Sequence, residues 1–600
     1  MKDLINFLII TLLAISSCTT HVENTVVQSG IELTPEAFSQ KLKDQFETDL
    51  TEVCKENLHF HDTLKSIYAN RNYEPLWWNA LLGDSSSWAK LEETFIYGQL
   101  HGMNKHYYHL PIVDYYRKEI EHSKTADSAY QLMAKCEVLV SNGLLQLYED
   151  IANGRTDPAD VYGYTYMLPR NNLKEWAYSD FLLSDNHIEE LSEIHEDDRT
   201  YKELLAVLKY YLAKNTQERS SAIDFSDHPK IELGDSTPII SLIIAKLKSK
   251  NLPDADIHQV PDTNVYTRAL HKEIKKLQAK YNLTPDGIMG YKTYRLINAT
   301  PSDKINQIRA NLERQRWFDK PQKGPFVYVN MPKYDVDLHW KDSVKSFRVC
   351  IGKNLPDNYD AMVREYTDSG WLYKLPKNME TPQIASNITY MMVNPTWTIP
   401  YSIIKREMWW KLVKDPSYLS RSGYKVFRGK EEINGDTIQW SRINKNKIPY
   451  HIVQNPGPEN ALGTVKYMFN NPFSIYLHDT PSKSAFGRTQ RAVSHGCVRL
   501  QKPILFGEFL MQNSNEYDAD DFRIMMGYPP RDPSRLKEFD PNDSTALVQK
   551  LEETTKIRLD KPMPLYLDYR TVYYDEDWQL HFAYDIYDQN KLITQAMEWY

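Results

Sequence analysis

The feature of this sequence that most constrains its fold is a change in hydrophobic period at about residue 325. Upstream of it, apolar residues recur at helical spacing, as they do at Ala134, Val138, Leu139, Leu144, Leu145 and Leu147. Downstream, apolar and polar residues alternate as they do in strands, for example at Tyr334, Val336 and Leu338. Because 600 residues are also too many for one hydrophobic core, the sequence predicts an α+β multidomain protein, with helical domains first and a β-rich domain last.

Two helical domains are expected before this change. The first is a helical scaffold domain over residues 35–250. The second is a small helical module over residues 262–300, in which one helix face is formed by Leu270, Ile274, Leu277 and Tyr281. A turn at Asp286-Gly287 then leads into a second helix.

The β-rich domain is expected to occupy residues 325–600. Its strand pattern is interrupted at about 401–448 by a helix-like piece that contains Met408, Trp409 and Trp410. We interpret this piece as an inserted cap over a groove. Strand-like runs at about 560–590 are expected to complete the sheet.

The N-terminus has the pattern of a targeting segment. Leu4 to Ile15 is a mostly apolar run, too short for an ordinary membrane span but long enough for a signal sequence. Small residues precede Cys18, so residues 1–18 resemble a bacterial lipoprotein signal with Cys18 as the lipidated residue. An ordinary secretory signal is the alternative, because Asp3 is atypical of a basic leader. Residues 19–34 are then a tether, and we expect a membrane-anchored lipoprotein in the periplasm of a Gram-negative-type bacterium.

Composition limits the partners and the redox chemistry. A net charge of −8 argues against nucleic acid as the main partner. The 41 tyrosines and 13 tryptophans are expected in cores and grooves, with a surface for carbohydrate or glycopeptide as the alternative. The five cysteines form no dense disulfide framework, although a Cys54–Cys136 bridge is possible in an oxidising compartment. No metal-ligand spacing occurs, so we expect neither a zinc site nor a cofactor.

The chemistry concentrates in the stretch from Ser494 to Arg499. Cys497 follows Gly496, and a cysteine on a tight turn can attack a carbonyl while main-chain N–H groups face it. The thiol needs a base, because its ordinary pKa of about 8.5 leaves it mostly protonated. His478, at the end of an apolar run, is the better base, since a neighbouring strand can bring its ring to the sulfur. His495 is expected to shape the turn or contact substrate.

Supporting roles are expected around this pair. The N–H groups of residues 495–497 could form an oxyanion hole, which Ser494, Gly496 and Asp479 would support. Arg499 could bind a carboxylate in a bidentate manner. Tyr467 is a further candidate for contact with substrate.

These residues resemble a known family. His478, fifteen intervening residues and Ser494-His495-Gly496-Cys497 are similar to the signature of the L,D-transpeptidase catalytic domain of the YkuD type. The family consensus has Asn two residues after the cysteine, whereas this chain has Arg499, as in the large periplasmic subfamily typified by YcbB. Further segments that match this subfamily are Val393-Asn394-Pro395, Asp415 to Leu419, Pro456 to Gly463, Lys466-Tyr467, and Tyr476 to Pro481.

The resemblance extends beyond the catalytic domain. Segments at Arg71-Asn72 and Gly154-Arg155 look like the subfamily's scaffold, and the module at 262–300 resembles a peptidoglycan-binding domain. The stretch from Lys353 to Lys377 departs from the subfamily, because it is longer than the usual strand connection.

The resemblance implies a reaction. Cys497 would attack the carbonyl between an L-centre and the terminal D-residue of a peptidoglycan stem peptide and form a thioester. The amine of a second stem would resolve it and leave a 3→3 cross-link. Carbapenem-type β-lactams would acylate Cys497.

Three other functions are compatible with the sequence, two that use Cys497 as the nucleophile and one that is not catalytic. Water as acceptor would make the protein an L,D-carboxypeptidase or amidase, and a protein amine would make it an enzyme that attaches proteins to peptidoglycan. A non-catalytic cell-wall-binding scaffold is the third reading, against which the intact His478 and Cys497 argue.

Overall fold

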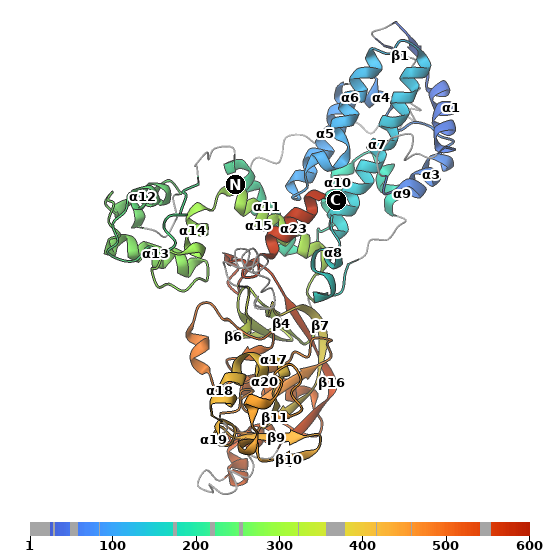
Figure 1. Cartoon of the computed structure of the whole chain (residues 1–600). Helices are drawn as coiled ribbons and strands as arrows, with labels where there is room; N and C mark the ends of the chain where they lie inside the picture. Colours follow the sequence, from blue (N-terminus) through green and yellow to red (C-terminus); the bar gives the residue numbers. More distant parts are fainter. Residues whose placement is uncertain are drawn as a thin grey trace. The chain divides into compact units, whose positions relative to one another are not determined.

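The computed structural model describes twelve stretches of the chain: residues 25–27, 30–48, 58–82, 85–171, 177–215, 222–250, 256–321, 323–355, 378–415, 417–457, 459–539 and 554–599. The fold is a mixed α+β multidomain one, as the sequence predicts (Figure 1). The chain divides into two compact units. Residues 1–153 and 173–197 form the first unit, and residues 154–172 and 198–600 form the second. The expected signal, Cys18, Cys54, half of the tether and the loop at 356–377 lie outside the described residues.

The first unit is helical and is built around one long helix (Figure 1). Its main helices are α1 (Pro35–Phe46), α3 (His61–Asn70), α4 (Trp78–Leu81), α5 (Ser85–Leu100), α6 (Leu110–Glu121), α7 (Ala126–Asn153), α9 (Ala177–Leu182) and α10 (His187–Glu193). Helix α7 is buried on most of its circumference, because α1, α3, α5, α6 and α9 all pack against it. In the described ranges, no helix has both the length and the hydropathy that crossing a bilayer requires.

A buried glutamate explains why the chain folds back near Arg71, in a segment that resembles the scaffold domain of the subfamily. Glu137 on α7 accepts hydrogen bonds from the Tyr68 hydroxyl (2.9 Å) and from the Trp77 main-chain N–H (3.2 Å). Burial raises the pKa of Glu137 to about 7. The segment therefore turns back onto α7 to satisfy a buried carboxyl group, which is a structural role.

The turn at Gly154-Arg155 belongs to the second unit, not to the helical one. Thr156 donates its main-chain N–H to Glu313 (2.8 Å) and accepts from the Trp317 indole (2.8 Å), both on helix α15 (Pro301–Trp317). The connection continues through α8 (Pro158–Tyr162) and β3 (Tyr166–Met167), and α11 (Arg199–Asn215) then packs on α15. The units thus divide the chain differently from the expected scaffold boundaries of 35–250.

The small helical module starts earlier than expected. Helices α12 (Ile239–Ser249), α13 (Arg268–Lys280) and α14 (Tyr291–Asn298) share one core. The predicted helix face is present, because Leu270, Ile274 and Leu277 are buried in that core and Tyr281 packs against it. Helix α12, which the sequence reading placed in the scaffold, is part of this module.

The β-rich domain is a sheet that closes on itself. Its strands are β4 (Phe326–Asn330), β5 (Asp335–Trp340), β6 (Ser343–Gly352), β7 (Gln383–Val393), β12 (Val465–Phe469), β13 (Leu477–His478), β15 (Val498–Leu500) and β16 (Thr555–Asp568). Their order is β12-β13-β15-β6-β5-β4-β16-β7, and β12 also pairs with β7. Apolar side chains from these strands form one core, which helix α20 (Pro503–Leu510) helps to cover.

The predicted insertion is a subdomain with its own sheet and core. Between β7 and β12 lie β8 (Trp397–Thr398), α17 (Tyr401–Ile403), the π-helix η5 (Ile404–Met408), α18 (Trp409–Lys414), α19 (Tyr418–Arg421), β9 (Tyr424–Arg428), β10 (Glu431–Ile433) and β11 (His451–Gln454). The four strands pair in the order β10-β9-β11-β8. Because β8 and β11 belong to this sheet, the cap is larger than the predicted 401–448.

The chain end contributes one strand to the main sheet. β16 lies between β4 and β7. The later part of the predicted stretch at 560–590 does not join this sheet: β17 (Val572–Tyr574) and β18 (Leu580–Phe582) form a separate hairpin. Helix α23 (Gln589–Trp599) follows and packs on α15.

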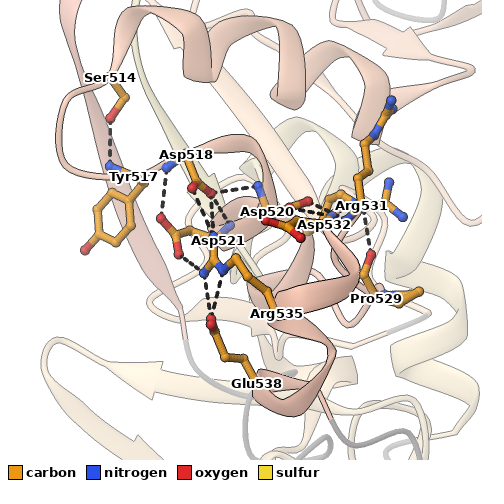
Figure 2. Close-up of polar contacts among 11 residues, drawn as sticks. Ser514, Tyr517, Asp518, Asp520, Asp521, Pro529, Arg531, Asp532, Arg535 and Glu538 are labelled. Atoms are coloured by element: carbon orange, nitrogen blue, oxygen red, sulfur yellow. Dashed lines mark hydrogen bonds and ion pairs between the residues drawn. The ribbon is translucent and has the colours of Figure 1, made fainter.

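An arginine holds the region after α20 together (Figure 2). Arg535, in the 3₁₀ segment η10 (Pro533–Glu538), pairs with Asp518 (3.0 Å) and Asp521 (2.7 Å) at the start of α21 (Ala519–Met525). Its own segment supplies Glu538 at 2.7 Å. All four charged groups are used in this clamp, so we assign it a structural role.

Candidate active site

The cysteine lies on a tight turn between β14 (Ala492–Ser494) and β15. Gly496 has φ of +107°, which side-chain-bearing residues rarely adopt. The Ser494 hydroxyl donates to the Cys497 carbonyl (2.6 Å) and accepts from the Gly496 N–H (3.3 Å). The Gly496 carbonyl accepts from the Thr381 hydroxyl (2.8 Å). The turn is therefore fixed from within by Ser494 and from outside by Thr381.

Strand register brings the candidate residues to one face of the sheet. β13 pairs in parallel with β15, so that His478 is opposite Arg499, and β12 places Lys466 opposite His478 on its other side. Tyr476 lies two residues before His478, and Cys497 lies two residues before Arg499. The Val498 N–H donates to the Tyr476 carbonyl (3.1 Å), which holds the two segments together. Alternation along a strand puts residues two apart on the same side.

His478 is a neutral imidazole in a buried position. Only 5% of its surface is exposed. Burial and the nearby Arg499 charge lower its pKa to about 4, against the opposing effect of main-chain hydrogen bonds to Asp479 and Leu462. Among the described residues, its Nδ1 atom has no hydrogen-bond partner. The ring is thus in the form that can accept a proton.

The Cys497 thiol is protonated at rest. Burial raises its pKa to about 11. Hydrogen bonds from the Tyr476 main chain and hydroxyl oppose that rise, as do the charges of Arg499 and Lys466. The same groups would stabilise negative charge on sulfur once the proton leaves.

Tyr476 and Lys466 are site residues that the sequence analysis did not select. The Lys466 ammonium lies 5.6 Å from the centre of the Tyr476 ring, and the Tyr476 ring meets the His478 ring edge-on at 5.5 Å. Burial lowers the pKa of Lys466, and the nearby Cys497 opposes this shift only in part. The sequence did contain a signal for Tyr476: it is two residues before His478, so a strand would place both side chains on the same face. The sequence marked Lys466-Tyr467 as a segment that matches the subfamily, but only the pairing of β12 with β13 shows that Lys466 faces the site.

Arg499 is the second cation of the site. It is half-buried, and its Nε atom makes no hydrogen bond within the described ranges. An arginine with an unpaired Nε next to a nucleophile is suited to a carboxylate ligand.

Tyr467 does not match the role predicted for it. Its side chain is fully buried in the domain core, and its hydroxyl donates to the Pro503 carbonyl (2.6 Å). It also packs edge-on against Phe506. Because neighbouring strand residues face opposite sides, Tyr467 points into the core while Lys466 points to the site.

Asp479 anchors the end of β13. Its carboxylate accepts from the Thr464 N–H and hydroxyl, both at 3.0 Å, and forms an ion pair with Lys483. These contacts fix the strand that carries His478. A carboxylate cannot donate to an oxyanion, so its contribution is positional.

His495 contacts the cap. Its Nε2 atom lies 2.6 Å from Oε1 of Glu407 on η5. The cap also approaches the site at Tyr476, because the Trp397 side chain lies near enough to that hydroxyl to lower its pKa. The cap therefore meets the catalytic turn at His495 and lies near the neighbouring Tyr476. Of the remaining cysteines, Cys350 and Cys136 are buried.

The stretch that contains this site resembles known proteins. Residues 324–512 match the family model of the L,D-transpeptidase catalytic domain, YkuD, and residues 62–208 match a scaffold domain. A curated relative from Haemophilus influenzae (strain ATCC 51907 / DSM 11121 / KW20 / Rd), named "Putative L,D-transpeptidase", is 26% identical over 297 residues. The match covers 49% of this chain, and the chain spans about half the length of that relative (50%).

Residues 324–512, which contain this site, are therefore a domain of the L,D-transpeptidase catalytic (YkuD) type. In this protein a YkuD-type catalytic domain is combined with an N-terminal scaffold domain, as the resemblance implied.

Proposed function

We propose that this protein is a peptidoglycan L,D-transpeptidase that forms 3→3 cross-links through a thioester on Cys497. The observation that carries the proposal is the common face shared by Cys497, the neutral His478 and two cations, Lys466 and Arg499. This set supplies a nucleophile, a base and a place for a carboxylate. The substrate is a stem peptide whose terminal D-residue carries that carboxylate.

The first half-reaction acylates the enzyme. As Sγ of Cys497 bonds to the carbonyl carbon between the L-centre and the terminal D-residue, its proton moves to His478. The resulting imidazolium gives this proton to the amide nitrogen of the D-residue, and the C–N bond breaks. The D-amino acid leaves with its carboxylate, and a thioester remains on Cys497.

The second half-reaction transfers the acyl group. An amine of a second stem attacks the thioester and loses a proton to His478. The C–S bond breaks, and His478 returns the proton to sulfur. A new amide bond joins the two stems, and the free enzyme is restored.

One main-chain donor is suited to the oxyanion. The N–H of Gly496 is already used by Ser494. The N–H of Cys497 donates to no group in the described part of the chain, so we assign it to the developing negative oxygen. Lys466 and Arg499 then remain for the substrate carboxylate and for charge on sulfur.

The reaction is tested by product analysis. Purified protein is incubated with disaccharide-tetrapeptide, and the products are identified by mass. We expect a cross-linked dimer that has lost one D-amino acid, and the Cys497→Ala variant should form neither this dimer nor the adduct with a carbapenem. An adduct on the Ala variant would exclude Cys497 as the nucleophile.

The same measurement separates the alternative acceptors. Release of the D-amino acid with formation of tripeptide alone would make water the acceptor and the enzyme an L,D-carboxypeptidase. A protein amine as acceptor would give a protein-linked muropeptide. No turnover by the folded wild-type protein would favour a non-catalytic wall-binding role.

We also propose that the enzyme acts at a membrane surface in the periplasm. The apolar run and Cys18 at the N-terminus support a lipid anchor, and the cell-wall family of the catalytic domain supports the compartment.

A further inference from the structure

A threonine far from the cysteine in sequence holds the catalytic turn. The Thr381 hydroxyl accepts from the Gly352 N–H (2.9 Å) and donates to the Gly496 carbonyl (2.8 Å). Thr381 is 1% exposed, so water does not replace either bond. One hydroxyl thus connects the end of β6 to the turn that carries Cys497, and its single proton is committed to Gly496.

This bond sets the direction of a catalytic N–H group. The carbonyl of Gly496 and the N–H of Cys497 belong to the same peptide unit, which is planar and trans, so the two groups point in opposite directions. A hydroxyl that fixes the carbonyl on one side therefore directs the Cys497 N–H to the other side. This matters at Gly496 in particular, because a glycine with positive φ has no side chain to limit rotation of that peptide.

The C-terminal segment supports Thr381 from behind. The Tyr587 hydroxyl donates to the Gly352 carbonyl (2.7 Å) and accepts from the Thr381 N–H (3.3 Å). Tyr569 in turn fixes Tyr587, since its hydroxyl accepts from the Tyr587 N–H (2.9 Å). Both tyrosines lie beyond the stretch that matches the catalytic-domain model, which ends at residue 512.

We propose that Thr381 is a positioning residue for acyl transfer: it directs the Cys497 N–H at the substrate oxyanion, and Tyr587 holds Thr381 in place for this task. The inference rests on the proposed function, because it assumes an acyl substrate at Cys497. It assigns to the C-terminal segment a part in catalysis that the matched catalytic domain does not contain.

The test compares two reactions of the same thiol. Acylation by the carbapenem imipenem passes through an oxyanion, whereas alkylation by iodoacetamide does not. Thr381→Val removes the hydroxyl and should slow acylation by roughly 10- to 100-fold, somewhat less than the loss of a whole oxyanion donor, while alkylation at pH 9 stays at the wild-type rate. Thr381→Ser, which keeps the hydroxyl, should restore acylation.

Two further variants separate positioning from general destabilisation. Thr571 is also buried, and its hydroxyl accepts from Asn311 (2.7 Å) at a place without contact to the turn. Thr571→Val should therefore lower the melting temperature without changing the ratio of acylation to alkylation. Tyr587→Phe, which keeps Thr381 intact, should lower this ratio by a smaller factor than Thr381→Val, and it gives the answer if Thr381→Val does not fold.

The outcomes are distinct. A lowered ratio in Thr381→Val and Tyr587→Phe, with recovery in Thr381→Ser, supports the inference. An unchanged ratio in both variants, or an equal loss in Thr571→Val, overturns it. Wild-type protein that alkylates but is not acylated would refute the proposed function itself, and the inference with it.

Discussion

At the residue scale, His478 and Cys497 form a neutral pair at rest. Burial lowers the pKa of the imidazole and raises that of the thiol, so in the proposed reaction the proton stays on sulfur until the substrate arrives. An exposed cysteine–histidine pair would more readily exchange this proton and become a thiolate–imidazolium pair. The low exposure of His478 and the charge of Arg499 therefore favour proton transfer during the attack.

The acid side of the pH profile follows from this arrangement. Protonated His478 cannot act as the base, and its pKa is lowered to about 4. We expect kcat/KM for carbapenem acylation to stay near its maximum at pH 5.5 and to fall only as the pH approaches 4. An inflection near the ordinary value of about 6.5 would contradict the assignment.

The same shift affects folding stability. Because the pKa of His478 is lower in the folded protein, the unfolded chain binds more protons between the ordinary value and about 4. The contribution of this group to stability should fall as the pH is lowered through that window.

The two histidines should differ in their effect on rate. His478→Ala should slow acylation by roughly 10²- to 10⁴-fold, the usual range for loss of a general base. His495 pairs with Glu407 of the cap, so His495→Ala should cost less. Stopped-flow measurement of acylation gives both rates, and a larger loss from His495→Ala would exchange the two roles.

At the scale of elements, the cap is a subdomain with its own core, and its two ends leave the main sheet next to each other. Its core contains Leu412, Val426 and Trp440, and the Asn394 N–H donates to the Thr464 carbonyl (2.8 Å) where the insertion begins and ends. The ends of the insertion are thus adjacent in the main sheet. A short bridge can replace the cap without stretching β7 or β12.

Deletion of residues 395–460, with a Gly/Ser bridge in their place, should leave the β domain folded. Turnover of tetrapeptide should fall by roughly tenfold or more, because Glu407 no longer holds His495 and the cap no longer covers this side of the site. Circular dichroism checks the fold, and muropeptide analysis measures turnover. A deletion protein with wild-type turnover would show that the cap has no part in the reaction.

At the scale of the whole molecule, the fold of the catalytic domain requires residues well beyond position 512, where the match to the family model ends. β16 fills the place between β4 and β7, and Tyr587 reaches Gly352 beside the catalytic turn. The second unit therefore folds around contacts between residues hundreds of positions apart.

The N-terminus should determine where the molecule works. Cys18→Ser should release the protein from membranes or block its processing while the purified catalytic domain stays active, because stable anchoring requires more than one lipid chain and a triacylated cysteine supplies several. Membrane fractionation and mass analysis of the mature N-terminus measure this. Mature wild-type protein in the soluble periplasm with an unmodified N-terminus beyond residue 18 would contradict the anchor.

Local pattern was enough to predict the domain classes and the candidate nucleophile. The change of period at about 325 and the buried face from Leu270 to Leu277 depend on residues a few positions apart, and so does the turn with Gly496 before Cys497. Such short-range signals survive in a single sequence because secondary structure and turns are specified locally.

Only the tertiary structure decided the rest of the site. Alternation could not say whether Tyr467 or Lys466 faces the cysteine, because a shift of one residue in register exchanges the two faces of a strand. Thr381 and Glu407 reach the catalytic turn across more than eighty residues of chain. Contacts of this kind depend on which strands pair and on where an insertion folds back, and these are properties of the whole chain.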